Sequence, residues 1–133
     1  MPGKTVNFGV IGCGLMGREF ASASSRWLHL TQDLPRPAII AACDTNEANL
    51  EWFRRDADTK FFYRDYHEML QNPEVEAVYA AVPHNLHAKV YGDVIRAGKH
   101  LIGEKPFGLD LKAFGEIQKA MDEHPEVLVR CSS

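Results

Sequence analysis

Three glycines with the spacing G-x-G-x-x-G lie in the stretch V-N-F-G-V-I-G-C-G-L-M-G-R-E-F. An apolar segment typical of a β-strand precedes them and a helical segment follows, which is the context that favours a dinucleotide-binding turn over an ordinary glycine turn. In such a turn Gly12 permits the sharp bend, Gly14 admits a pyrophosphate, and Gly17 lets the helix lie close to the strand. The unpaired amides at the start of the helix, at Leu15 and Met16, would complete an anion site.

Asp44 directly follows the second apolar segment, residues 38–43. A carboxylate at this point of a dinucleotide-binding fold accepts hydrogen bonds from the ribose hydroxyls, and its charge repels a 2′-phosphate. Because residues 45–48 contain no Lys or Arg, we expect NAD as the cofactor, with NADP less favoured. The alternative is that Asp44 only caps the following helix, although Thr45 or Asn46 could also do so.

Two later loops carry the other candidate residues. Pro83, Asn85 and His87 follow the fourth apolar segment, and Glu104 and Lys105 follow the fifth. Because ligands of open parallel sheets bind beyond the carboxyl ends of the strands, both loops are expected to line the same crevice. Lys105 is a compact positive charge suited to a diphosphate or a substrate hydroxyl. The less favoured alternative is that it is simply a solvated loop lysine.

Histidine and cysteine do not predict a metal site. His84 and His87 are three residues apart, but no third ligand lies near them in sequence. We interpret them as hydrogen-bonding groups of the crevice. The cysteines, Cys13, Cys43 and Cys131, form no C-x-x-C pair. We expect the first two to be small packing residues, with a redox-sensing thiol as the less favoured alternative.

The apolar segments predict an alternation of strands and helices. Strands are expected at residues 6–11, 38–43, 60–63, 77–82, 100–103 and 127–131. Helices are expected from residue 15 towards 26, and at 46–55, 66–71, 86–97 and 109–123. In the connection at 22–37, we expect Pro35 and Pro37 to end an extended helix or a further turn. This pattern indicates an α/β fold, a doubly wound parallel sheet (Rossmann fold) of about six strands with helices on both faces.

Composition excludes several classes of function. The chain has 133 residues, which favours a single domain, and its 45% hydrophobic and 25% charged residues are typical of a globular protein. The net charge of −3, without a basic stripe, argues against nucleic acid as a partner. Neither a signal peptide nor an apolar run of membrane-spanning length is evident, so we expect no membrane association and a cytoplasmic protein.

Two longer motifs resemble a known family. They are A-V-Y-A-A-V-P-H-N-L-H, residues 77–87, and A-G-K-H-L-I-G-E-K-P-F, residues 97–107. With the glycine turn and Cys43-Asp44, the chain resembles the amino-terminal domain of the glucose-fructose oxidoreductase / inositol dehydrogenase (Gfo/Idh/MocA) family. The resemblance implies NAD(P)-dependent oxidation of a hydroxyl on a sugar, cyclitol or related polyol. It also places Lys105 beside the nicotinamide and the substrate as a catalytic residue.

In that family a second α/β domain supplies the remaining catalytic residues, an Asp and a His of a D-x-x-x-H motif. This sequence stops at Ser133, after the sixth predicted strand. We therefore expect residues 1–133 to be the dinucleotide-binding domain alone, able to bind cofactor but not to catalyse, with oligomerisation through the missing domain. The alternative is a free-standing module that senses the nicotinamide redox state or regulates a partner.

Overall fold

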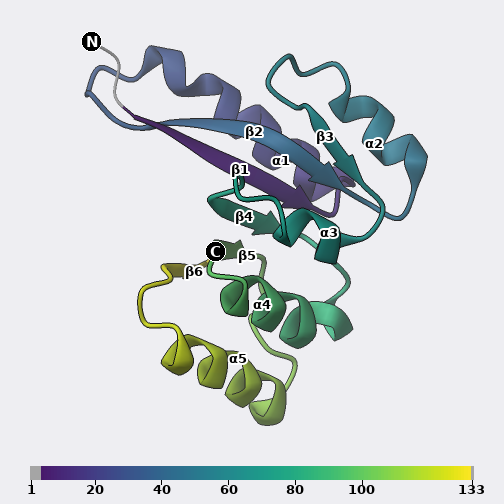
Figure 1. Cartoon of the computed structure of the whole chain (residues 1–133), viewed down its shortest axis with the longest axis vertical. Helices are drawn as coiled ribbons and strands as arrows, with labels where there is room; N and C mark the ends of the chain where they lie inside the picture. The colour runs from purple at the N-terminus through teal and green to yellow at the C-terminus, as the bar shows by residue number, and fades with distance from the viewer. Residues whose placement is uncertain (1–3, 133) are drawn as a thin grey trace.

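Six parallel strands form one sheet at the centre of the molecule (Figure 1). The structure is a computed structural model and describes residues 4–132. The strands are β1 (Thr5–Ile11), β2 (Arg36–Cys43), β3 (Phe61–Tyr63), β4 (Ala77–Ala80), β5 (His100–Gly103) and β6 (Val129–Cys131). Their spatial order is β3-β2-β1-β4-β5-β6. The chain runs outward from β1 in one direction and then returns to run outward in the other, which confirms the predicted doubly wound sheet.

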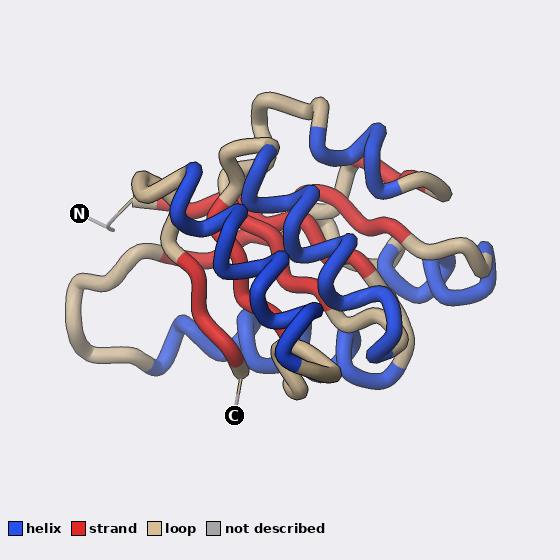
Figure 2. The backbone as a smooth tube through the Cα atoms, turned by 90° about the horizontal axis from the view of Figure 1, so that it is seen from below, coloured by secondary structure: helices blue, strands red, loops and turns tan. Residues whose placement is uncertain are grey.

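Helices cover both faces of this sheet (Figure 2). They are α1 (Leu15–Ser24), α2 (Glu47–Phe53), α3 (Tyr66–Leu70), α4 (His87–Arg96) and α5 (Leu111–Glu123), with short 3₁₀ helices η1 (Ser25–His29) and η2 (His84–Leu86). α1 and α2 pack on one face, whereas α3, α4 and α5 pack on the other. Among the described residues, none of these helices has the length and apolar character needed to cross a membrane.

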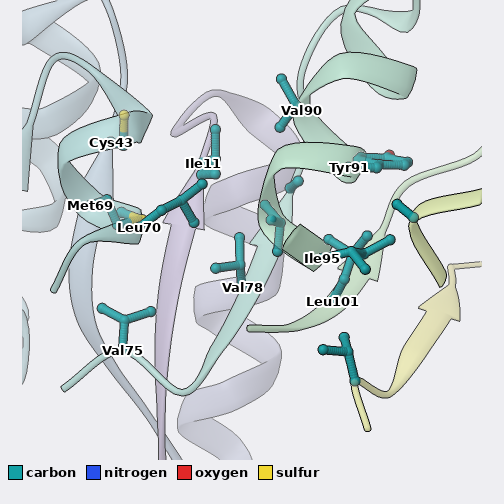
Figure 3. Close-up of a cluster of buried hydrophobic side chains, with 14 of the residues drawn as sticks. Ile11, Cys43, Met69, Leu70, Val75, Val78, Val90, Tyr91, Ile95 and Leu101 are labelled. Atoms are coloured by element: carbon teal, nitrogen blue, oxygen red, sulfur yellow. The ribbon is translucent and has the colours of Figure 1, made fainter. Parts of the chain in front are cut away.

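The larger core lies under α3, α4 and α5 (Figure 3). Ile11, Val78 and Leu101 project from three strands towards Tyr91 and Ile95 of α4, and all five are almost completely buried. Burial of one such side chain contributes about 1.5–3 kcal/mol. Because the central strands are covered on both faces, their sequences are continuously apolar rather than alternating. This core keeps the carboxyl ends of the strands in register at one edge.

The second strand differs from its prediction. The helical region after the glycine turn ends with η1 at His29, and β2 begins at Arg36 rather than at residue 38. Pro37 therefore lies inside the strand and pairs with Val6 instead of ending a helix. A proline is tolerated there because β3 pairs only with the last part of β2, from Ala41 onward, so the first part of β2 is an edge strand.

Capping side chains determine where several helices begin. Asn46 caps α2 by accepting a hydrogen bond from the Ala48 amide at 2.9 Å, so of the two predicted caps it is Asn46 that acts. Asp65 caps α3 by accepting a hydrogen bond from the His67 amide at 2.9 Å. Asp110 caps α5, which starts at Leu111 and not at residue 109.

Other boundaries differ by one or two residues. β4 ends at Ala80, two residues before its predicted end, and β6 begins at Val129, two residues late. α2 ends at Phe53 instead of residue 55. Gly98 follows α4 with a φ of +78°, the left-handed conformation expected for the glycine that ends a helix.

Candidate functional site

A cleft of about 600 Å³ opens at the carboxyl ends of the central strands. The loops after β1, β2, β3 and β4 all contribute to it. Its lining residues are Ile11, Gly12, Gly14, Cys43, Asp44, Thr45, Asn49, Arg64, Asp65, Tyr66, Ala81, Val82, Pro83, Leu86 and Val90. β1 and β4 are neighbours in the sheet although the chain leaves them in opposite directions. The cleft therefore lies at the switch point, where open α/β sheets bind their ligands.

Gly12 makes the sharp turn at the end of β1. Its φ is +92°, a conformation that side-chain-bearing residues rarely adopt. A Cβ atom on Gly12 would lie 2.1 Å from the carbonyl oxygen of Ala81. The Gly12 amide donates to the Cys43 carbonyl at 2.9 Å. The turn is thus held against both neighbouring strands, and only glycine fits there.

Gly17 and Gly14 have different surroundings. A Cβ on Gly17 would lie 2.2 Å from the Gly12 carbonyl oxygen, so Gly17 lets α1 pack directly on the turn. A Cβ on Gly14 would meet no atom within 4 Å. Gly14 precedes α1 without any side-chain cap, which leaves the first amides of the helix, at Leu15 and Met16, free for an anion. Gly14 therefore faces open space of the kind that a pyrophosphate requires.

Asp44 connects the glycine turn to α2. Its Oδ2 accepts hydrogen bonds from the Cys13 amide at 2.8 Å and from Asn49 Nδ2 at 3.1 Å, and its Oδ1 accepts from the Asn46 amide at 2.8 Å. Because Asn46 caps α2, the alternative of a purely capping role for Asp44 is excluded. An ionised carboxylate has about four acceptor positions, so three donors hold Asp44 in place and leave room for a ribose hydroxyl.

Of the three candidate residues in the loop after β4, two lie at the cleft surface and one is buried. Pro83 lines the cleft and Asn85 lies exposed beside it. His87 is buried, with Nδ1 2.5 Å from the Pro106 carbonyl oxygen and Nε2 3.0 Å from the Val82 carbonyl oxygen. Both ring nitrogens thus face backbone carbonyl oxygens inside the protein. His87 is a hydrogen-bonding group as predicted, but the prediction that it lines the crevice was wrong, because its buried ring ties the Val82 and Pro106 loops together.

Glu104 is also engaged by neighbouring side chains. Tyr79 Oη donates to Glu104 Oε1 at 2.5 Å, and Tyr91 Oη donates to the Glu104 carbonyl at 2.6 Å. Burial raises the pKa of Tyr79, and its hydrogen bond to the Glu104 carboxylate raises it further. Glu104 does not line the cleft. The structure shows it as an anchor of the loop that carries Lys105, and direct contact with cofactor stays a prediction.

Lys105 follows this anchored residue and is exposed to solvent. The next residue, Pro106, is held through its carbonyl oxygen by His87, and Glu104 is held by the two tyrosines. The backbone at Lys105 is therefore held in place, but its exposed side chain does not line the cleft as expected, and its contact with a ligand stays a prediction.

Burial disfavours the reactive thiolate form of Cys13 and Cys43. It raises the pKa of both thiols to about 12, and the Asp44 charge acts in the same direction. A thiol that stays protonated is a poor nucleophile, which favours the packing role over redox sensing. Among the described residues, no group of three or more His, Cys, Asp or Glu side chains could hold a metal ion.

Several cleft residues escaped prediction. Arg64 and Asp65 follow β3, Tyr66 begins α3, and Asn49 comes from α2. β3 contains only three residues, Phe61–Tyr63, and so short a segment gives a weak strand signal in the sequence. The sequence did contain a usable signal, because a polar segment after any strand of a parallel sheet meets the same edge.

Comparison with known proteins agrees with this geometry. Residues 6–130 match the family model GFO_IDH_MocA, described as an oxidoreductase family with an NAD-binding Rossmann fold. The chain belongs to the Gfo/Idh/MocA family. The match confirms the resemblance drawn from the two long motifs, and the family description agrees with NAD as the expected cofactor.

Individual Gfo/Idh/MocA relatives include sugar and cyclitol dehydrogenases. The levoglucosan dehydrogenase of Pseudarthrobacter phenanthrenivorans is 32% identical over 122 residues, covering 89% of this chain and 30% of that protein. The inositol 2-dehydrogenase/D-chiro-inositol 3-dehydrogenase of Lactiplantibacillus plantarum is 28% identical over 106 residues, 78% of this chain and 28% of that protein. The scyllo-inositol dehydrogenase of Lactobacillus casei, solved with bound NAD(H) and scyllo-inositol, superposes with a TM-score of 0.85 at 25% identity, over 97% of this chain and 36% of that chain.

The coverage values also show how much of each relative this chain represents. The chain spans about a third of the length of each of these three proteins. It corresponds to their amino-terminal NAD-binding domain.

Proposed function

We propose that this chain is the cofactor-binding part of a dehydrogenase that oxidises a hydroxyl of a sugar, cyclitol or related polyol. The observation that carries the proposal is the cleft at the switch point, with an open Gly14, uncapped α1 amides and the fixed carboxylate of Asp44. Relatives that act on inositols and levoglucosan support the substrate class. The domain assignment, residues 1–133 as one dinucleotide-binding unit of a longer enzyme, is part of the same proposal.

The described residues fit an NAD molecule. Gly14 leaves space where a pyrophosphate would approach the backbone, and α1 directs its free amides and the positive end of its dipole there. Asp44 has an acceptor position left for the adenosine ribose. Bound NAD would supply the hydride acceptor of the reaction.

The protein's own part in the chemistry is positioning. Asp44 and the α1 amides would hold the dinucleotide at two points, and Lys105 would meet the substrate hydroxyl. A lysine ammonium has three donors and no lone pair, so Lys105 can orient the hydroxyl oxygen and stabilise charge on it. A base that removes the hydroxyl proton, as an alcohol oxidation requires, would then come from outside residues 4–132.

We expect the chain to bind NADH more tightly than NADPH by about 1.5–3 kcal/mol, because a 2′-phosphate at Asp44 loses a charge-assisted hydrogen bond and meets a like charge. Asp44→Asn keeps one carbonyl oxygen of the carboxylate, so it should weaken NADH binding and narrow the difference between the cofactors. Titrations followed by nicotinamide fluorescence measure both affinities. Asp58→Asn is the matched control, since Asp58 pairs with Arg36 at 2.8 Å and does not line the cleft. Equal affinities in the native chain would refute the role of Asp44.

We also expect the 133-residue chain to bind NAD without oxidising sugars or inositols. Positioning of the reacting carbon and removal of the proton each contribute large rate factors. This chain would hold the cofactor and the substrate hydroxyl, whereas the surface that holds the reacting carbon and the base would lie outside it. Incubation with NAD and a panel of polyols, followed by NADH absorbance, is the measurement. Turnover of about 1 per second or faster would show that the chain is a complete enzyme. If the chain binds NADH without oxidising any polyol, and its reading frame ends at Ser133, the result would instead favour the sensing module.

A further inference from the structure

Arg64 lies at the edge of the cleft beside Asp44. It follows β3, and its Nη2 donates to the carbonyl oxygen of Thr45, the residue next to Asp44. Among the described residues that line the cleft, Arg64 alone carries a positive charge. Its side chain is 61% exposed, so the guanidinium can still move toward a ligand.

We propose that Arg64 is a second cofactor-specificity residue, the cation that contacts the 2′-phosphate when NADP(H) enters the cleft. The inference rests on the proposed function, because it assumes a dinucleotide whose adenosine ribose lies at Asp44. In NADP(H) the extra phosphate is attached to that ribose. A phosphate there would lie close to Thr45, where the Arg64 guanidinium is already placed.

Glu47 holds Arg64 only loosely. The distance from Arg64 Nη1 to Glu47 Oε2 is 3.8 Å, whereas Arg54 Nη2 lies 3.0 Å from Glu47 Oε1. If Arg64 moves to a phosphate, Glu47 therefore keeps Arg54 as its partner. Arginine binds phosphate through two parallel N–H groups, which a single distant carboxylate oxygen does not match. Arg64 should therefore pair with a 2′-phosphate in preference to Glu47.

The surrounding charges explain why Arg64 does not make NADP(H) the preferred cofactor. Among the described residues that line the cleft, two carboxylates, those of Asp44 and Asp65, outnumber the single cation Arg64. Arg64 reduces the repulsion of a 2′-phosphate without reversing it. The NADPH affinity of the native chain should therefore be weaker than its NADH affinity and still measurable.

The test compares both cofactors in four variants. Arg64→Ala should lower NADPH affinity roughly 3- to 10-fold more than it lowers NADH affinity, because a charge-assisted contact to phosphate is lost. Arg64→Lys should retain part of the NADPH affinity, since the charge remains without the planar fork. Glu47→Gln should raise NADPH affinity about 2- to 5-fold by releasing Arg64 and removing a like charge, and most of this gain should disappear in the Glu47→Gln/Arg64→Ala double variant.

Arg55→Ala is the matched control. Arg55 is exposed on the same half of the domain, packs over the Trp52 ring at 4.8 Å and does not line the cleft. Arg55→Ala removes one positive charge, as Arg64→Ala does, but at a site away from the cleft. Any change that it causes in cofactor affinity should disappear when the ionic strength is raised. The inference is overturned if Arg64→Ala weakens NADPH and NADH equally, or if Arg55→Ala has the same effect as Arg64→Ala. Failure of NADH to bind the native chain would overturn the proposed function as well, so the two failures are distinguishable.

Discussion

Replacement of Gly14 by valine is expected to abolish dinucleotide binding in a chain that still folds. Gly14 has a negative φ of −75°, which residues with a side chain also adopt, and its Cβ would meet no protein atom within 4 Å. The added side chain would instead fill the space in front of the α1 amides. Loss of two charge-assisted hydrogen bonds to a pyrophosphate, at about 1.5–3 kcal/mol each, corresponds to a loss of roughly 100-fold or more in affinity.

Circular dichroism and a thermal melt must accompany the binding titration for Gly14→Val. We expect the free energy of unfolding to change by no more than about 1 kcal/mol, the usual range for a residue that precedes a helix. Gly14→Ala, with a smaller side chain, should lose less affinity than Gly14→Val. Normal NADH binding by a folded Gly14→Val variant would show that this turn is not the phosphate site.

Replacement of Gly12 by alanine should have the opposite effect and destabilise the fold itself. The φ of +92° is strained for alanine, and its Cβ would overlap the Ala81 carbonyl oxygen at 2.1 Å. Backbone strain and overpacking each cost about 1–3 kcal/mol, so the free energy of unfolding should fall by about 2–6 kcal/mol. For a domain of this size, the melting temperature should drop on the order of 10 °C.

Gly115→Ala provides the control for this second experiment. Gly115 lies within α5, and a Cβ there would meet no atom within 4 Å. Alanine has the higher helix propensity, so this variant should be as stable as the native chain or more stable by up to about 1 kcal/mol. A Gly12→Ala variant that melts at the native temperature would mean that the turn can relax away from β4.

Much of the fold could be predicted because it depends on local properties of the chain. Continuous apolar segments such as β4, residues 77–80, predict strands buried on both faces, and the helical segments between them predict parallel crossovers. The capping role of Asp65 follows from its residue type and position. The glycine turn and Asp44 were identifiable because their spacing follows directly from a strand, a turn and a helix.

The sequence by itself therefore determined the order of elements, the doubly wound sheet and the family. Only the tertiary structure decided which side chains remain available at the cleft. It engaged both nitrogens of His87 with carbonyl oxygens, anchored Glu104 to Tyr79, and brought Arg64 to the carbonyl of Thr45. These contacts join residues 5 to 25 positions apart. Local propensity and spacing carry no information about such partners, because their distance depends on how neighbouring strands and loops pack.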